Sequence, residues 1–383
     1  MSQDKPTHES YLVVGGGPVA EAVVKLLKPQ NLAIAFGSMW AKLLPPKVVS
    51  DAIQSCQATC IIHTGIVSTP VITNITYPSV YTAPPTEAQR KEMLEEINVV
   101  MKRTSIDGTR NLISAIPKTT VKQLVYFGSA DCTFDGTERP NMSEVDVPCL
   151  PQAWVPALEP RSFGERSVLN ANGQNGLATA VIRPAFLFGP TFHSYMGLLR
   201  CQRTPHLSAV CVGDNTNISD TTFIDNAAHA GILAADRLTR AHPQHAATAG
   251  RAFFVSDDDP RPSWDLERDL WAAASHTTPP VPVRVPLSRF LRKPGPLARL
   301  RGRTGPRTEK EKNMHWFCAT RTYDISLARD VLGYAPIVTH DEGIRRTAEW
   351  WLEKQRKLSA LKNETQATID NPPPAYDAKT QSN

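Results

Sequence analysis

Short apolar runs, separated by turn residues and by stretches with helical spacing, recur through the first half of the chain. Runs with the length and the Val/Ile content of buried strands occupy 11–14, 32–36, 59–63, 123–127 and 178–183. Helices are expected between them: one directly after the first run, one over about 87–115 and one over about 161–172. Strands that alternate with helices at this spacing predict an α/β fold built on a doubly wound parallel sheet.

The pattern becomes irregular in the second half of the chain, which indicates a second unit. We interpret 11–190 as a Rossmann-type dinucleotide-binding domain. The stretch 191–355 is interpreted as mainly a smaller C-terminal substrate lobe, with segments that return to the large domain. A proline-rich loop is expected over about 136–160, at the carboxyl edge of the sheet, where open α/β sheets bind ligands. The polar ends, 1–10 and 356–383, are expected to be disordered.

Composition narrows the class of protein. The chain has 383 residues, of which 41% are hydrophobic and 21% charged, and its net charge is +5, as in ordinary soluble globular proteins. No block of like charge with interleaved aromatic residues indicates a nucleic-acid partner. The seven cysteines show no CxxC spacing typical of a metal site. Without an apolar N-terminal segment or about 18 consecutive apolar residues, the chain is predicted to be cytoplasmic, with peripheral contact to the endoplasmic reticulum membrane as a further hypothesis.

A series of short motifs identifies a family. They occur in one order along the chain: Gly108-Thr-Arg-Asn111, Val125-Tyr-Phe-Gly-Ser-Ala130, Phe134-Asp-Gly136, Val168-Leu-Asn-Ala-Asn172, Ile182-Arg-Pro-Ala-Phe-Leu-Phe-Gly-Pro190, Val212-Gly-Asp-Asn-Thr-Asn217, Phe223-Ile-Asp-Asn-Ala-Ala-His-Ala230 and Leu332-Gly-Tyr-Ala-Pro336. Over about 11–355 the chain therefore resembles the 3β-hydroxysteroid dehydrogenase and sterol-4α-carboxylate 3-dehydrogenase family of extended short-chain dehydrogenases/reductases. The resemblance implies NAD(P)-dependent oxidation of a 3β-hydroxyl on a sterol, a terpenoid or a related hydrophobic secondary metabolite.

The resemblance also places the cofactor site. The family's GxxGxxG turn falls on Gly15, Pro18 and Glu21, so that only the first glycine is present. Proline removes a backbone donor, and Glu21 is expected to put a charge where the helix should pack closely against the sheet. His63-Thr-Gly65 resembles an element that lies under the cofactor; the other interpretation is that it only fills the end of a strand. The candidate positions for NAD or NADP are Gly15, Gly17, Val19, His63, Thr64 and Pro184.

The catalytic positions that the resemblance implies are partly lost. Enzymes of this family use a serine to orient the carbinol oxygen, a tyrosine as the acid–base group, and a lysine that lowers the pKa of the tyrosine. Ser129 matches the serine, although a strand-end hydroxyl that bonds the local backbone is an equal interpretation. The YxxxK motif falls on Ala157 and Arg161, and no tyrosine occurs between Tyr126 and Tyr195. Alanine cannot transfer a proton, and arginine stays protonated; Arg161 is either an anion-binding group or a solvated helix residue.

Three functions remain open from the sequence. The chain is an NAD(P)-dependent oxidoreductase with a substitute for the tyrosine, a non-redox tailoring enzyme such as an isomerase or cyclase that uses the same cleft, or a catalytically inactive binding or scaffold protein. The residues at the motif positions favour weak or absent dehydrogenase activity, because the cofactor and proton-transfer requirements are disturbed together.

Two surface segments suggest partners. The mixed basic and apolar stretch 284–312 predicts either peripheral contact with anionic lipid or a solvated loop. Pro373-Pro-Ala-Tyr376 fits the PPxY pattern that WW domains bind, a pattern that also arises by chance in proline-rich tails.

Overall fold

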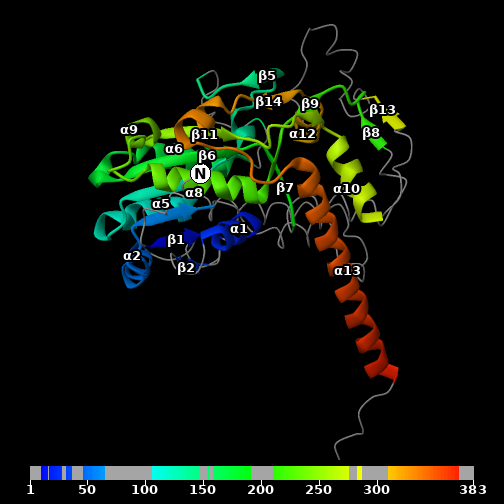
Figure 1. The fold of residues 1–383 in the computed structure, drawn as a ribbon, viewed down its shortest axis with the longest axis horizontal. Helices are drawn as coiled ribbons and strands as arrows, with labels where there is room; N and C mark the ends of the chain where they lie inside the picture. Colours follow the sequence, from blue (N-terminus) through cyan, green and yellow to red (C-terminus); the bar gives the residue numbers. More distant parts are fainter. Residues whose placement is uncertain are drawn as a thin grey trace, which may run out of the picture.

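The core of the protein is one parallel sheet. The computed structural model describes residues 10–15, 17–27, 32–36, 46–64, 106–145, 154, 158–190, 210–275, 283–286 and 309–370. Six strands form the sheet, and every neighbouring pair is parallel. Their order across the sheet is β2 (Leu32–Phe36), β1 (Tyr11–Val14), β3 (Cys60–His63), β4 (Gln123–Phe127), β6 (Ala178–Pro184) and β11 (Arg251–Val255). The predicted doubly wound α/β sheet is confirmed (Figure 1).

Helices cover both faces of this sheet, which explains why its strands read as continuous apolar runs. On one face the core includes side chains of α1 (Pro18–Leu27) and α8 (Ile224–Arg237). On the other face it includes side chains of α2 (Pro46–Ser55), α5 (Gly108–Ala115) and α6 (Glu159–Asn170). All four residues of β1 and all seven of β6 are buried.

In the described part of the chain, three smaller sheets accompany the main sheet. A four-stranded sheet has the order β12 (Arg261–Pro262), β9 (Ile218–Ser219), β14 (Arg321–Tyr323) and β5 (Arg139–Met142). Two parallel pairs join β7 (Phe186–Phe188) to β10 (Thr221–Phe223) and β8 (Val210–Val212) to β13 (Val283–Val285). The remaining helices are α9 (His245–Thr248), α10 (Asp265–Ser275), α12 (Glu309–Cys318) and α13 (His340–Asp370). Short 3-10 or π turns are η3 (Ile116–Lys118), η4 (Ala130–Thr133), η6 (Gln174–Gly176) and η9 (Ala328–Leu332).

Two elements from the second half of the chain, β11 and α8, pack with elements from the first half. β11 pairs with β6 at the edge of the main sheet, and α8 packs against α1. Close helix packing is possible because the buried side of α8 carries small residues, among them Ala227, Ala228 and Gly231. The four-stranded sheet in turn includes β5 from the first half of the chain.

Three sequence-based expectations need correction. α2 was not predicted, although its two core residues, Val49 and Ile53, have helical spacing. β5 lies inside the predicted loop over 136–160. The predicted disordered tail from 356 is wrong as far as Asp370, because α13 continues to that residue (Figure 1). The stretch 353–370 contains no proline, and an ion pair at helical spacing, Glu353 with Lys357 at 2.6 Å, supports the helix.

Several predictions fall outside the described residues. Most of the helix expected over 87–115 lies there, and only the part from 106 onward is described. Residues 287–308 of the lipid-contact segment and the WW-type motif at Pro373–Tyr376 lie there too. Within the described ranges, no helix has the length and apolar character needed to cross a membrane.

Candidate functional site

The turn after β1 keeps the backbone shape of a dinucleotide cradle. Gly15 has φ of +133° and Gly17 has φ of +98°, values that side chains with a Cβ rarely adopt. A Cβ on Gly15 would lie 2.1 Å from Thr64 Oγ1, so the residue after β3 reaches directly to the turn. Thr64 is fixed there because its amide donates to the carbonyl of Val14 at 2.9 Å. The structure thus brings together two predicted cofactor positions, Gly15 and Thr64.

The substitutions in the glycine motif disturb this turn less than the sequence predicts. Pro18 is the first residue of α1, where a helix has no use for the missing N–H. The predicted clash of Glu21 with helix–sheet packing is wrong, because Glu21 is exposed and its neighbours Ala20 and Ala22 are buried. The Glu21 amide donates to the Gly17 carbonyl at 3.1 Å, so the first turn of α1 is closed normally. The cradle therefore fits a dinucleotide by its backbone, with one donor fewer.

His63 is committed to contacts inside the protein. Its Nδ1 lies 3.2 Å from the Val14 carbonyl oxygen and its Nε2 lies 3.1 Å from Thr109 Oγ1. A carbonyl can only accept, so Nδ1 carries the proton and Nε2 accepts from the threonine hydroxyl. The ring is buried and meets Tyr126 edge-on at 5.2 Å. His63 closes the strand end, and neither ring nitrogen remains for a ligand.

The two other predicted cofactor positions contribute shape. Val19 is buried in the core beneath the glycine turn. Pro184 ends β6, is paired with Val255 of β11 and lies at the carboxyl edge of the sheet. Neither side chain carries a hydrogen-bonding group, so any contact with a cofactor would be apolar.

Ser129 lies at the end of β4 and caps a short helical turn. Its Oγ accepts a hydrogen bond from the amide of Asp131 at 3.3 Å, as expected if the hydroxyl bonds the local backbone. An accepting hydroxyl still has its own proton to donate. The hydroxyl makes no second hydrogen bond with a described residue, so this geometry also suits contact with a ligand oxygen.

Asp131 is a polar residue of this region that sequence reasoning missed. Its Oδ1 accepts from Arg321 Nη1 at 2.5 Å and from Trp316 Nε1 at 3.0 Å. The Arg321 guanidinium lies over the Trp316 ring at 4.1 Å, and both Asp131 and Arg321 are buried. Because the partners follow Asp131 by about 190 positions, no local sequence signal could have indicated the contact.

A buried ion pair lies one turn after the position of the lost YxxxK motif. Arg161 is half-buried in the first turns of α6 and makes no ion pair with a described residue, while Ala157 lies outside the described residues. One turn further on, the fully buried Glu165 accepts from Arg183 Nη2 at 2.6 Å and from Arg183 Nε at 2.9 Å. A Cβ on Gly128 would lie 2.6 Å from Glu165 Oε2, so α6 is fitted tightly against the end of β4.

No tyrosine in the described ranges replaces the missing one. Four tyrosines lie there, and each phenol is enclosed by protein. Tyr11 donates to Asp236 Oδ1 at 2.8 Å and Tyr334 donates to the Ser256 carbonyl at 2.9 Å. Burial raises the pKa of Tyr11, Tyr323 and Tyr334 above the ordinary phenol value, which is opposite to what acid–base catalysis needs.

The Tyr126 hydroxyl is pressed against α6, because a Cβ on Gly164 would lie 2.3 Å from it. Tyr126 also precedes the candidate Ser129 by three positions and belongs to the interior of β4. It therefore acts as a core residue beneath the site.

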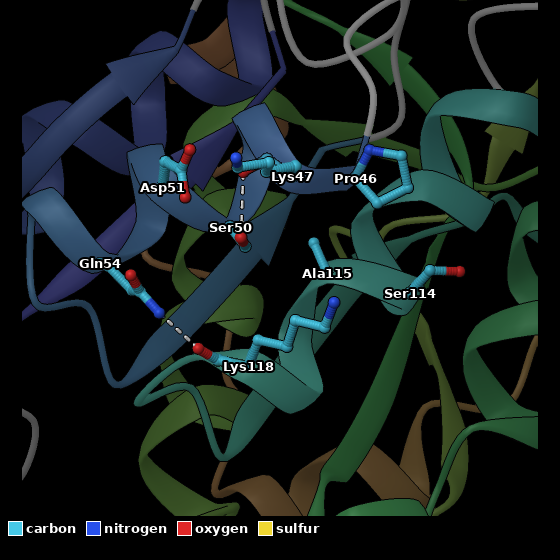
Figure 2. A pocket seen from close by; sticks show the side chains of 8 residues that line it. All are labelled: Pro46, Lys47, Ser50, Asp51, Gln54, Ser114, Ala115 and Lys118. Atoms are coloured by element: carbon cyan, nitrogen blue, oxygen red, sulfur yellow. Dashed lines mark hydrogen bonds between the residues drawn. The ribbon is translucent and has the colours of Figure 1, made fainter.

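A cavity of about 260 Å³ lies elsewhere, in the groove between α2 and the end of α5 (Figure 2). It is lined by Pro46, Lys47, Ser50, Asp51, Gln54, Ser114, Ala115 and Lys118. Two lining groups bond the local backbone: Ser50 Oγ donates to the Lys47 carbonyl and Gln54 Nε2 donates to the Lys118 carbonyl. None of the candidate site residues lines this cavity, so we do not connect it with the motifs.

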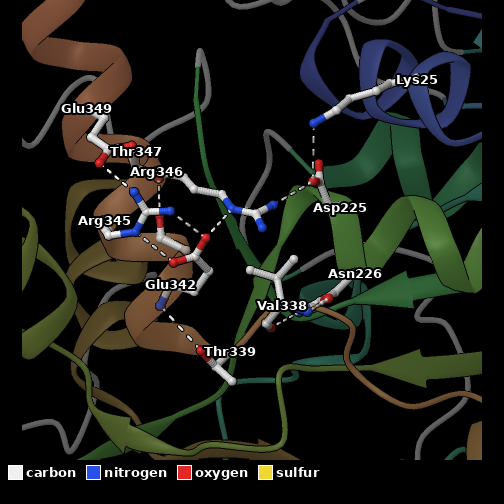
Figure 3. A network of polar contacts seen from close by, with 11 residues as sticks. Lys25, Asp225, Asn226, Val338, Thr339, Glu342, Arg345, Arg346, Thr347 and Glu349 are labelled. Carbon is white, nitrogen blue, oxygen red and sulfur yellow. Dashed lines mark hydrogen bonds and ion pairs between the residues drawn. The ribbon is translucent and has the colours of Figure 1, made fainter.

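A polar network joins the helix of the glycine turn to the last helix (Figure 3). Asp225, in the first turn of α8, lies 3.8 Å from Lys25 of α1 and 3.4 Å from Arg346 of α13. Arg346 also bonds Glu342 at 2.6 Å. Asp225 is buried, and its charge is compensated by cations of two helices that are distant in sequence.

Comparison with known proteins supports the motif-based assignment. Residues 46–285 match the 3-beta hydroxysteroid dehydrogenase/isomerase family. The chain is 34% identical over 285 residues to a decarboxylating sterol-4-alpha-carboxylate 3-dehydrogenase of Schizosaccharomyces pombe, covering 71% of this chain and 76% of the relative. It is 30% identical over 320 residues to the corresponding enzyme of Candida albicans, covering 81% of each chain.

Solved structures show the same fold at low identity. A UDP-glucose 4-epimerase from Thermotoga maritima, solved with UDP-glucose, matches with a TM-score of 0.59 at 14% identity, covering 90% of this chain and 99% of that chain. A dTDP-glucose 4,6-dehydratase from Bacillus anthracis, solved in complex with NAD, matches with a TM-score of 0.58 at 12% identity, covering 91% and 98%. The family reaction is NAD(P)-dependent oxidation of a sterol 3-hydroxyl, as predicted from the motifs. On these matches and this fold, the chain belongs to the 3-beta hydroxysteroid dehydrogenase/isomerase family.

Proposed function

We propose that this protein binds a nicotinamide dinucleotide and a small hydrophobic alcohol of the sterol class. We further propose that it oxidises 3β-hydroxyls far more slowly than family members with an intact YxxxK motif, or not at all. The observation that carries the proposal is the combination of a preserved glycine turn with the absence, among the described tyrosines, of an accessible phenol near Ser129.

Dinucleotide binding is supported by the backbone of the turn. Pyrophosphate is held by backbone N–H groups and by the positive end of a helix, so side-chain substitutions matter only where they block the approach. Gly15 retains the required conformation, and Glu21 points to solvent. The remaining change is the N–H that Pro18 lacks, which weakens a cradle without filling it.

Slow oxidation is supported by the chemistry of proton transfer. Removal of a hydride from a carbinol requires that its hydroxyl proton leaves to a base, and a positioned acid–base group typically contributes about 10²- to 10⁴-fold in rate. Alanine at position 157 cannot accept that proton. Arg161 is a permanent cation that can hold an anion but cannot supply the base. We therefore expect turnover lower by about this factor.

Two further functions remain as outcomes of the test. A non-redox tailoring reaction would use the hydroxyl of Ser129 without transfer of a hydride. A binding or scaffold role would need the cleft alone. Both predict sterol binding without nicotinamide reduction, and they differ in whether the bound sterol is recovered unchanged.

The experiment is thermal unfolding of the full chain with and without millimolar NAD⁺, NADH, NADP⁺ and NADPH, followed by sterol turnover. A ligand present at about 100 times its dissociation constant adds roughly 2.7 kcal/mol to native-state stability, a readily visible shift. We expect a shift with at least one nucleotide and little product from 3β-hydroxysterols. A cooperative transition that no nucleotide moves would contradict the binding part, and turnover like that of ordinary dehydrogenases would contradict the rest.

A further inference from the structure

The turn after β4 carries a hydroxyl, that of Ser129, whose hydrogen bonds with described residues are known. Ser129 Oγ accepts from the Asp131 amide at 3.3 Å, and this hydroxyl makes no other hydrogen bond with a described residue. A hydroxyl has one proton and two lone pairs, so an oxygen that accepts from the backbone keeps its proton for a ligand. Ser129 therefore offers a donor at the carboxyl end of β4.

The same turn presents an acceptor. Asp131 Oδ1 takes both hydrogen bonds from the small-lobe residues Arg321 and Trp316, while Oδ2 receives none from a described residue. Only 6% of Asp131 is exposed, but Oδ2 is not one of the fully enclosed atoms without a partner, so an added group can reach it. The second oxygen can therefore accept from a donor group of a bound molecule.

Both groups are held in place from two sides. Ser129 and Asp131 are joined by their own turn, and Asp131 is anchored across the boundary between the large domain and the small sheet by Arg321 of β14 and Trp316 of α12. The guanidinium over the indole, at 4.1 Å, leaves the anchor little freedom to rotate. A donor and an acceptor two positions apart thus lie directly after β4, at the edge where open α/β sheets bind their ligands.

An alcohol is the functional group that matches such a pair. Its oxygen can accept from Ser129 while its proton is donated to Asp131, whereas a ketone accepts only and leaves Oδ2 without a donor. We infer that Ser129 and Asp131 together receive the hydroxyl of the ligand, and that Asp131 makes the cleft select the alcohol over the corresponding ketone. This inference rests on the proposed function and names the residue that determines its specificity.

The test is binding of two sterols that share one ring skeleton, a 3β-hydroxysterol and its 3-ketone, to the full chain without nucleotide. A hydrogen bond to a charged group corresponds to about 10- to 100-fold in affinity, so the wild type should prefer the alcohol by that factor. Asp131→Asn replaces Oδ2 by an amide group that donates, while Oδ1 can still accept from Arg321 and Trp316. The alcohol preference should then fall at least about tenfold or reverse in favour of the ketone.

Two variants separate this effect from general damage. Ser129→Ala removes a donor that both ligands use, so it should weaken both and leave their affinity ratio unchanged. Asp135→Asn makes the same chemical change at the partly exposed acid that pairs with Arg139 in the following loop, and it should change neither affinity. The two affinities are measured on the same sample of each variant. A smaller folded fraction therefore lowers both apparent affinities equally and leaves their ratio unchanged.

Asp131→Asn leaves Arg321 without its counter-charge, and a buried guanidinium without a partner can prevent folding. Asp131→Asn combined with Arg321→Gln replaces the ion pair by a neutral amide pair and repeats the comparison. An alcohol preference that survives in a folded Asp131 variant overturns the assignment of Asp131 and leaves the proposed function standing. If the wild type binds neither sterol, the proposed function is wrong and the inference with it.

Discussion

The glycine turn after β1 and the region around Ser129 have both departed from the family motifs, but with different consequences. In the turn, Pro18 and Glu21 replace glycines, yet Gly15 keeps φ of +133° and Glu21 lies in solvent. The positions that the motifs align with the acid–base tyrosine and its lysine are Ala157 and Arg161, and each described phenol is buried. The first site is built from backbone and the second from side chains.

This difference explains why one site tolerates substitution. A backbone cradle survives as long as no atom fills it, because its donors belong to every residue except proline. Proton transfer depends on one titratable atom at one place, and neither alanine nor arginine can provide it. Members of the family can therefore lose the reaction while they keep the fold and the nucleotide cradle.

The largest effect on stability is expected beneath the side-chain site. Glu165→Gln leaves Arg183 buried without its counter-charge, and breaking a buried pair costs about 3–5 kcal/mol. The measurement is the free energy of unfolding by chemical denaturation. Glu349→Gln breaks the exposed pair with Arg345 and should cost no more than about 1 kcal/mol. Equal effects of the two changes would show that the Glu165 pair does not hold α6 against β6.

The next largest effect, on nucleotide affinity, is expected when the glycine turn is disrupted. Gly15→Val places a side chain against Thr64 at a φ that favours glycine, and we expect nucleotide affinity to fall more than about 100-fold, the equivalent of about 2.7 kcal/mol. The measurement is the nucleotide-induced shift in Tm. Gly173→Ala is the matched control, because Gly173 also has positive φ and a Cβ there meets no atom within 4 Å. It should lower stability and leave the nucleotide shift intact; loss of the shift in both variants would contradict a local cradle.

A smaller effect concerns pH. Burial raises the pKa of Asp257 to about 7, although its carboxylate accepts from Asn226, the Phe223 amide and Thr221. The folded-state pKa lies above that of the unfolded chain, so its contribution to stability is full at low pH and is lost as pH rises towards about 7. Stability should decline by at most about 1.4 kcal/mol per pH unit for this one group between about pH 4 and 7.

Asp257→Asn removes the titrating proton and keeps an acceptor for the Phe223 amide, so the pH dependence should flatten. Burial also raises the pKa of Asp220, to about 6, and its share of the slope should remain in this variant. The measurement is denaturant unfolding at a series of pH values. If the slope of stability against pH is unchanged in Asp257→Asn, Asp257 does not cause the pH dependence.

The smallest effect is expected in the network that links the two halves. Arg346→Gln removes one of two cations beside Asp225 but leaves Lys25 in place (Figure 3). The arginine is half-exposed, so stability should fall by no more than about 1 kcal/mol, measured by denaturant unfolding. The nucleotide shift should not change. A reduced shift would show that α13 helps to shape the glycine turn through α1.

The sequence predicts those parts of the fold that depend on local pattern. The apolar runs locate β1, β2 and β4 with their observed bounds, because strands buried on both faces leave a continuous apolar signal. α2 and the second half of α13 were missed, the first because only Val49 and Ile53 bring it into the apolar core and the second because a polar helix and a disordered tail have similar composition. Only backbone hydrogen bonding separates these two states.

For the site, the motifs located Gly15, Thr64 and Ser129 but not what surrounds them. The outward orientation of Glu21 depends on the phase of α1, which the motif alone does not fix. The anchoring of Asp131 by Arg321 and Trp316 depends on a contact between the two halves of the chain. Such contacts are set by tertiary packing and leave no periodic trace in the sequence.

The central claim is that the nucleotide cradle persists while proton transfer is lost. The most direct measurement is the rate of NAD(P)H formation from a 3β-hydroxysterol at saturating nucleotide, for the wild type and for Ala157→Tyr combined with Arg161→Lys. The account predicts a wild-type rate lower than that of the double variant by about 10²- to 10⁴-fold. A wild type that already reduces nucleotide at ordinary dehydrogenase rates, with no gain in the double variant, would contradict it.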